Sequence, residues 1–394
     1  MHALLLAAVL ALDLTAARSA FHELDAMCEA DGGRLWNRSL CGPTILVDPQ
    51  TRKALTRDKS GKIAELTLPE SLGIANTAVE WNGERWTMVM LPLPEEKLER
   101  RALLAHESFH RIQEELGFPA TGPANAHLDS LEGRYWLRME WRALAAAMSC
   151  GCEGDQRREA IEDALIFRAK RQALFAEAKG EEQQLEMHEG LAEHTGMALA
   201  DPCLSCRMKS IARKLEKAEK KDALVRSFAY ASGPAWGALV ELKNAGWTLE
   251  AKSGDDLAEL ARAAWGLAPA DAMLAGKRAE RYEGAKVREE ELARDRKRAD
   301  EIAKLRARYV DGPVLVLPLG QMQMQFDPNG LTPLEGVGTV YRSITLSDAW
   351  GKIVAKDGAV ITSDFRKLIV PAAGDFEITL SPGWKRDGGT VVRE

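Results

Sequence analysis

Apolar and polar residues alternate near the start of the chain, which is typical of β-strands. The alternation runs from Thr77 to Leu91 on both sides of Asn82-Gly83. An Asn-Gly pair between two alternating segments indicates a β-hairpin closed by a type I′ turn. A shorter apolar run, Thr44–Val47, predicts a buried strand before it. The hairpin would lead directly into the helix that follows it. The strand at its outer edge could pair with an extended peptide.

The apolar spacing changes to a helical period after this hairpin. Apolar residues recur at steps of three and four over residues 103–113, 128–148 and 155–178, and another helix is expected to begin near Glu182. Residues 207–221 are rich in charge and predict a helix with a solvated face. The middle of the chain is therefore predicted to be mainly helical.

The last third of the chain shows two further patterns. Residues 276–309 predict one long, highly charged helix with a thin apolar stripe, suited to link two domains. After Gly312-Pro313 the strand pattern returns, and Asp357-Gly358 is expected to close a hairpin. The predicted fold class is α+β, in which an N-terminal β-hairpin or sheet leads into a helical core and a small β-domain ends the chain.

Composition and charge narrow the function classes. The chain has 394 residues, 46% of them hydrophobic, and a net charge of -6. General nucleic-acid binding needs a basic face, and a negative chain whose lysines and arginines are interleaved with acids does not suit it, so no nucleic-acid partner is expected. Residues 1–20 are apolar and then small, which predicts a signal peptide and a secreted or periplasmic protein. A buried N-terminal helix is the alternative, and no membrane span is expected in the mature chain.

The six cysteines occur in close-set pairs, which favours disulfides in an exported protein. A structural zinc held by the last four is the alternative, although a Cys-x-Cys spacing is unusual for such a site. The connectivity is left open. The pairs are Cys28 with Cys41, Cys150 with Cys152, and Cys203 with Cys206.

A His-Glu-x-x-His motif lies in the predicted helix over residues 103–113. His106 and His110 are four residues apart, so both imidazoles fall on one face of the helix. Two imidazoles with an adjacent carboxylate suit Zn²⁺ and a water that the carboxylate deprotonates. Glu107 is the candidate general base. Two core-facing histidines beside a surface glutamate are the alternative interpretation.

A zinc site with two histidines needs a third protein ligand. Glu189 and Glu193 share one face of a later helix, so one could bind the metal while the other supports a liganding imidazole. Other candidates are His188 and His194, which point away from the Glu189 face by roughly 100° and about 140° on an α-helix. Two further candidates for the third ligand are His127 and Asp129, although Asp129 could instead cap a helix.

These motifs resemble the gluzincin superfamily of zinc metallopeptidases over residues 77–245. The resemblance rests on the His-Glu-x-x-His motif and on Glu189-Gly190-Leu191-Ala192-Glu193. It implies that Glu189 is the third zinc ligand and that Glu193 supports a zinc-bound histidine. A Tyr-x-x-Gly segment at Tyr230 is similar to one that follows the third ligand in several gluzincins, which implies that Tyr230 stabilises the tetrahedral intermediate. A buried aromatic side chain is the alternative for Tyr230.

The combined prediction is an exported zinc-dependent metallohydrolase that cleaves a peptide or protein substrate. Its domains would be a signal peptide (1–20), a zincin-like metallohydrolase domain (21–275) with a helical insertion (120–180), a linker helix (276–310) and a C-terminal β-domain (311–394). The alternatives are a non-catalytic binding or scaffold protein that retains the fold, and a zinc hydrolase of a non-peptide amide.

Overall fold

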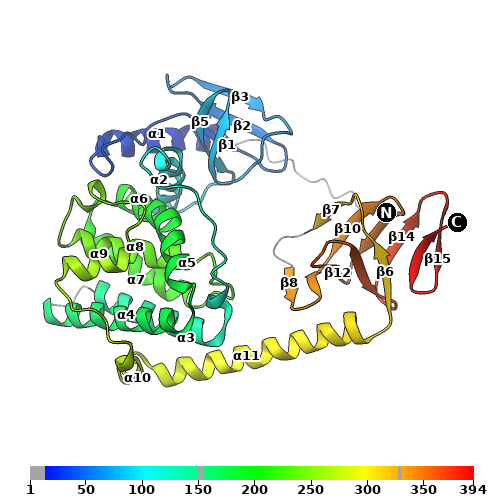
Figure 1. The fold of residues 1–394 in the computed structure, drawn as a ribbon. Helices are drawn as coiled ribbons and strands as arrows, with labels where there is room; N and C mark the ends of the chain where they lie inside the picture. Colours follow the sequence, from blue (N-terminus) through cyan, green and yellow to red (C-terminus); the bar gives the residue numbers. More distant parts are fainter. Residues whose placement is uncertain (1–13, 150–153, 327–330) are drawn as a thin grey trace, which may run out of the picture. The chain divides into compact units, whose positions relative to one another are not determined.

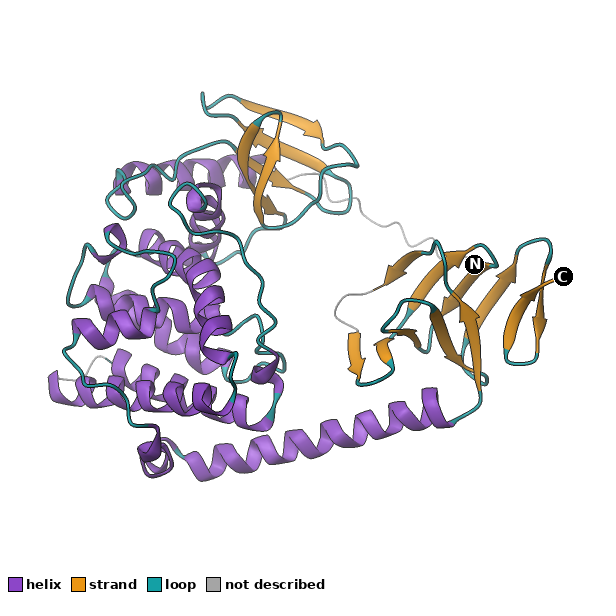
Figure 2. Cartoon of the chain, viewed as in Figure 1, coloured by secondary structure: helices purple, strands orange, loops and turns teal. Residues whose placement is uncertain are grey.

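The computed structural model describes residues 14–149, 154–326 and 331–394 (Figure 1). The chain divides into two compact units, one ending at Glu291 and the other running from Leu292 to Glu394. The α+β prediction is confirmed: a five-stranded sheet is followed by a helical region and then by C-terminal β-sheets (Figure 2). Among the described residues, no helix is both long and apolar enough to span a membrane.

The N-terminal sheet has the strand order β3-β2-β1-β5-β4. Asn82 and Gly83 both have positive φ, 53° and 75°, as the predicted type I′ turn between β4 and β5 requires. β4 forms the edge of the sheet, and β1 pairs in parallel with β5 beside it. Alternate residues of β1 enter different cores, because Ile45 packs with other strand residues while Leu46 joins the main core with the helices. The strands are β1 (Thr44–Val47), β2 (Lys53–Arg57), β3 (Ile63–Thr67), β4 (Thr77–Trp81) and β5 (Glu84–Met90).

Helix α1 (Leu14–Asp31) includes the end of the predicted signal peptide. Its residues Ala17 and Ala20 are buried in the main core, whereas residues 1–13 lie outside the described part of the chain. The signal peptide therefore stays a prediction. The cysteines give a mixed result: Cys203 and Cys206 form a disulfide, but Cys28 and Cys41 are free thiols.

Cys28 and Cys41, one of the close-set pairs for which disulfides were favoured, contact each other as two thiols. The hydrogen bond to Cys41 and burial raise the pKa of the Cys28 thiol, so it stays protonated. Cys150 and Cys152 lie outside the described residues.

Two helices form the scaffold of the predicted motif. Helix α2 (Lys97–Gln113) begins at Glu96, whose side chain accepts a hydrogen bond from the Glu99 amide, and it packs against α6 (Leu191–Ala200). The two backbones approach closely at Gly196, where a Cβ atom would lie 2.5 Å from the carbonyl oxygen of Ala102. A side chain at position 196 would therefore separate the helices.

A buried ion-pair network holds the helices that precede α6. Arg171 pairs with Glu140 at 2.7 Å and with Glu182 at 2.6 Å, and all three side chains are fully buried. Arg168 adds a pair with Glu186 at 2.7 Å. The network joins α3 (Leu131–Met148), α4 (Gly154–Leu174) and α5 (Ala178–Leu185).

The chain passes from α5 into α6 through a wide π-helical turn, Glu186–Gly190. The expected helix near Glu182 is thus present, but it is not a regular α-helix. Gly190 lies against Gly233 of α8 (Ala229–Glu241), where a Cβ on Gly233 would lie 2.3 Å from the Gly190 Cα. This close approach brings the start of α8 beside the π-helical turn.

The expected single helix over residues 276–309 is interrupted. Helix α10 (Ala275–Ala279) and a 3₁₀ turn end at Glu283, whose φ of 56° breaks the helical path before α11 (Gly284–Arg306) begins. A hydrogen bond from the Tyr282 hydroxyl to Asp163 of α4 holds the break in place. The remaining helices are α7 (Leu204–Ala218) and α9 (Leu257–Ala264).

The second unit contains a seven-stranded and a four-stranded sheet around an apolar core. The expected hairpin at Asp357-Gly358 is wrong, because β11 pairs with β10 and β14 while β12 pairs with β9 and β13. The turn instead carries the chain from one sheet to the other. The strands are β6 (Val314–Pro318), β7 (Gln323–Phe326), β8 (Leu331–Leu334), β9 (Gly338–Tyr341), β10 (Ile344–Asp348), β11 (Gly351–Ala355), β12 (Ala359–Thr362), β13 (Lys367–Pro371), β14 (Phe376–Leu380), β15 (Trp384–Asp387) and β16 (Thr390–Arg393).

Candidate metal centre

Helix α2 presents the His-Glu-x-x-His motif on its inner face. His106, Glu107 and His110 are all buried, and their nitrogen and oxygen donors lie within 4.8 Å of one another. The helix is fixed by Leu104 and Phe109, which are fully buried in the main core. A helix anchored through its apolar residues in this way holds both imidazoles with little freedom.

The π-helical turn brings Glu189 to the same point. Its Oε2 lies 3.4 Å from Nε2 of His106 and 3.4 Å from Nε2 of His110, and the two nitrogens are 3.1 Å apart. A tetrahedral site with bonds of about 2.0–2.1 Å has donor atoms about 3.3–3.4 Å apart. These three donors therefore have the spacing of a zinc-binding triangle.

The outer nitrogen of His106 is held by Glu193 of α6. Nδ1 of His106 lies 2.8 Å from Glu193 Oε2, while Lys214 forms an ion pair with Oε1 of the same carboxylate. Burial raises the pKa of Glu193, but Lys214 and His106 outweigh burial and lower it to about 2. An ionised Glu193 can only accept, so Nδ1 of His106 carries the proton and its Nε2 faces Glu189.

Gln113 plays the same part for His110. Its amide nitrogen donates to the carbonyl oxygens of Met187 at 3.3 Å and His188 at 2.9 Å, which fixes the orientation of the amide. Its Oε1 then accepts from Nδ1 of His110 at 2.6 Å, leaving Nε2 directed at Glu189. Sequence reasoning missed Gln113, although its position three residues after His110 places it within reach on the helix.

The electrostatics of the centre favour an added positive charge. Burial lowers the pKa of His106, but hydrogen bonds to Glu189 and Glu193 outweigh burial and raise it to about 10. Burial also acts to raise the pKa of Glu189, yet its contacts with His106 and His110 hold it well below the usual range. These carboxylates favour a positive charge at the imidazole Nε2 atoms, which a proton or a metal ion can supply.

Glu107 lies beside this triangle with unused hydrogen-bonding capacity. The side chain is 4% exposed, and Oε2 has no hydrogen-bond partner among the described residues. Burial raises the pKa of its carboxyl group. A buried carboxylate oxygen without a partner fits a site that receives a water molecule or a ligand.

Tyr230, at the start of α8, contacts two members of the group. Its hydroxyl donates to Glu189 Oε2 at 2.6 Å, and its ring stacks on that of His106 with centroids 5.5 Å apart. Burial, together with the charge of Glu189, raises the pKa of the phenol, so it remains a hydrogen-bond donor at neutral pH. The structure thus brings together all six predicted site residues: His106, Glu107, His110, Glu189, Glu193 and Tyr230.

His188 lies closer to the centre than the α-helical projection suggested. It belongs to the π-helical turn, and its donor atom lies within 4.8 Å of donors on His110 and Glu189. His194 is directed elsewhere, with its ring 5.2 Å from that of Trp247. His127 is engaged with Glu182 at 2.8 Å, and the N-cap of α3 is Ser130 rather than Asp129.

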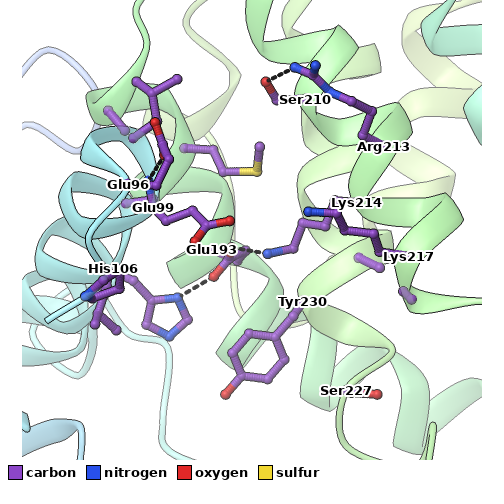
Figure 3. A pocket seen from close by; sticks show the side chains of 18 of the residues that line it. Glu96, Glu99, His106, Glu193, Ser210, Arg213, Lys214, Lys217, Ser227 and Tyr230 are labelled. Carbon is purple, nitrogen blue, oxygen red and sulfur yellow. Dashed lines mark hydrogen bonds and ion pairs between the residues drawn. The ribbon is translucent and has the colours of Figure 1, made fainter. Parts of the chain in front are cut away.

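A cavity of about 1030 Å³ opens onto the centre (Figure 3). His106, Glu107, Glu193 and Tyr230 line it, whereas His110 and Glu189 do not, so the cavity reaches the centre on the side of His106 and Glu107. Helix α7 forms another wall, and its exposed residues Arg213 and Lys217, which belong to the predicted solvated face, line the cavity.

The chain matches no family model, no curated protein and no solved structure in the comparisons made. The functional proposal is therefore based on the geometry of the site. It establishes a buried His106-Glu107-His110 group on α2 that could hold a metal ion.

Proposed function

We propose that the protein is a zinc-dependent metallohydrolase that cleaves peptide bonds. The main support is that His106 Nε2, His110 Nε2 and Glu189 Oε2 converge beside Glu107, whose Oε2 has no hydrogen-bond partner among the described residues. His106 and Glu107 also line a cavity. Two imidazoles and one carboxylate match the ligand set of catalytic zinc sites, which keep a fourth position open.

Each side chain then has a defined task. His106, His110 and Glu189 would hold zinc, which supplies a Lewis acid and lowers the pKa of a water. Glu107 accepts the proton of the attacking water through its free Oε2 and passes it to the leaving amine. Tyr230 donates its hydroxyl to the developing oxyanion after leaving Glu189, and burial keeps that phenol protonated.

The edge of the N-terminal sheet supports a peptide substrate. β4 ends the strand order, so the described residues provide no strand partner on its outer side. Asn76, directly before β4, lines the same cavity as His106 and Glu107. An extended peptide hydrogen-bonded to β4 would therefore pass close to the metal centre.

We further propose that the protein is secreted or periplasmic, with residues 1–20 as its signal peptide. The apolar run at the start of the sequence supports export. The Cys203–Cys206 disulfide also suits an oxidising compartment.

Metal analysis tests the ligand set. Purified protein should hold about one zinc ion per chain, and Glu189→Ala should lose it. Glu177→Ala is the matched control, because Glu177 is exposed in the same region of the chain. Zinc retained in full by Glu189→Ala would exclude Glu189 as the third ligand and direct attention to His188, which has a donor atom within 4.8 Å of one on His110.

Incubation with a pool of synthetic peptides tests the reaction. Mass spectrometry should detect cleaved peptides with the zinc-loaded protein, none after treatment with a chelator, and cleavage again after zinc is restored. Absence of cleavage by zinc-loaded protein would refute the peptidase assignment.

A further inference from the structure

Helix α7 and the loop after it place a row of cations on the cavity wall. Arg213 and Lys217 are four residues apart on α7, so they project from one side of the helix, and Lys221 and Arg226 follow in the loop. All four are exposed and line the cavity that contains His106 and Glu107. Figure 3 shows Arg213 and Lys217 on the wall that faces the start of α2. We call Arg213, Lys217, Lys221 and Arg226 the cationic wall.

The cationic wall has no internal counter-charge. Among the described residues, no carboxylate lies within ion-pair distance of any of its four members, whereas Lys214 beside them is paired with Glu193. The lining carboxylates that have no ion pair among the described residues lie on other elements: Glu96 and Glu99 are at the start of α2, and Asp201 follows α6. The unpaired cations are therefore gathered on the side of the cavity formed by α7 and the loop after it.

The cationic wall is also held in position. Arg134 donates to the carbonyl oxygens of Lys221 at 3.2 Å and Asp222 at 2.8 Å, and this guanidinium is itself paired with Glu291 at 2.9 Å. Leu224 and Phe228, on either side of Arg226, are fully buried. These contacts fix the backbone that carries Lys221 and Arg226, which keeps the cations gathered on one wall while their exposed side chains can turn toward an anionic ligand.

We propose that the cationic wall selects peptides that carry carboxylates next to the cleaved bond. The proposal rests on the proposed function, since it takes this cavity as the substrate cleft. Exposed lysines and arginines attract carboxylates through long-range charge and weak individual pairs, so several of them together give a preference that salt reduces. The carboxylate could belong to acidic side chains or to the C-terminus of the peptide.

A binding experiment on the full chain separates these cases. The Glu107→Gln protein is mixed with dye-labelled peptides of equal length, and fluorescence anisotropy is recorded. One peptide alternates Glu and Ala and ends in an amide. The second has Gln in place of each Glu, and the third is the Gln peptide with a free C-terminal carboxylate. At low salt we expect the Glu peptide to bind about tenfold more tightly than the amidated Gln peptide.

Matched variants assign this preference to the cationic wall. Lys217→Gln combined with Lys221→Gln should reduce the preference to about twofold or less. Lys209→Gln with Lys220→Gln is the control, because it removes the same charge from exposed positions near α7 that do not line the cavity. If only the third peptide binds tightly, the cationic wall recognises the C-terminal carboxylate of a peptide rather than acidic side chains.

Three results would overturn the proposal: equal binding of all three peptides, a preference that survives in the Lys217→Gln and Lys221→Gln variant, or displacement of the Glu peptide by an oligonucleotide that binds more tightly. Because binding is measured without turnover, the two claims can fail separately. Acidic-peptide binding without any cleavage would refute the proposed function alone. Cleavage of the Glu and amidated Gln peptides by the unsubstituted protein with equal kcat/KM would refute the selectivity alone.

Discussion

Glu193 accepts a hydrogen bond from Nδ1 of His106 at 2.8 Å, which turns the opposite nitrogen of that imidazole toward Glu189. The contact joins α2 to α6, whose backbones also approach closely at Gly196. Positioning of a liganding histidine by a carboxylate fixes its tautomer and increases its basicity. The metal centre thus depends on a residue that would not itself touch the metal.

Replacement of Glu193 should weaken zinc binding. In Glu193→Ala, His106 loses its hydrogen-bond acceptor, and the dissociation constant for zinc should rise about 10- to 100-fold. Competition with a chromophoric chelator measures this constant. Glu216→Ala is the control, because Glu216 is exposed on α7 and does not line the cavity. An unchanged constant in Glu193→Ala would show that the contact with His106 does not support the metal.

Removal of the Tyr230 hydroxyl should affect turnover more than binding. Tyr230→Phe keeps the ring that stacks on His106 but removes the donor, so kcat should fall about 10²-fold with KM little changed. Steady-state kinetics at equal zinc content measures the effect. Loss of zinc from Tyr230→Phe would instead mean that the hydroxyl serves to hold Glu189 in place.

Acid should weaken the helical region through Glu182. Burial alone would raise the pKa of this carboxyl group, but Arg171 outweighs burial and holds it well below the usual range. Because the folded-state pKa is below the unfolded value of about 4.3, the stabilisation is complete above that pH and is lost as the pH falls below it.

Glu182→Gln measures the size of this effect. At pH 7 the variant should have a free energy of unfolding about 3 kcal/mol lower than the unsubstituted protein, since a buried arginine loses a partner. The difference should shrink as the pH falls below about 4, as followed by urea unfolding. Glu177→Gln, at an exposed position, is the control. A difference independent of pH would contradict an ionised, paired Glu182.

Short-range patterns predicted much of this architecture. The Asn82-Gly83 turn, the helix of His106 and His110 and the shared direction of Glu189 and Glu193 follow from local geometry, and the structure has all three. Local geometry did not predict that His188 lies near His110 and Glu189, because that depends on how the π-helical turn packs beside α2. Nothing in the surrounding sequence marks that turn.

Other features depend on which elements pack together. The charges of α7 are equally compatible with a solvated face and with a cavity wall, and only the position of α2 and α6 opposite Lys214 decides between them. The Asp357-Gly358 turn is locally the same whether it joins paired strands or strands of two sheets. Gln113 was missed because its role requires the backbone of the distant turn at His188.

The most direct test of the central claim is the rate of peptide cleavage by Glu107→Gln, compared with the unsubstituted protein at equal zinc content. The substitution keeps the size of the side chain but removes the carboxylate that accepts the water's proton, while the three ligands remain. We predict that Glu107→Gln holds about one zinc ion per chain and that its kcat falls by at least about 10²-fold. Full activity in zinc-loaded Glu107→Gln would contradict the account.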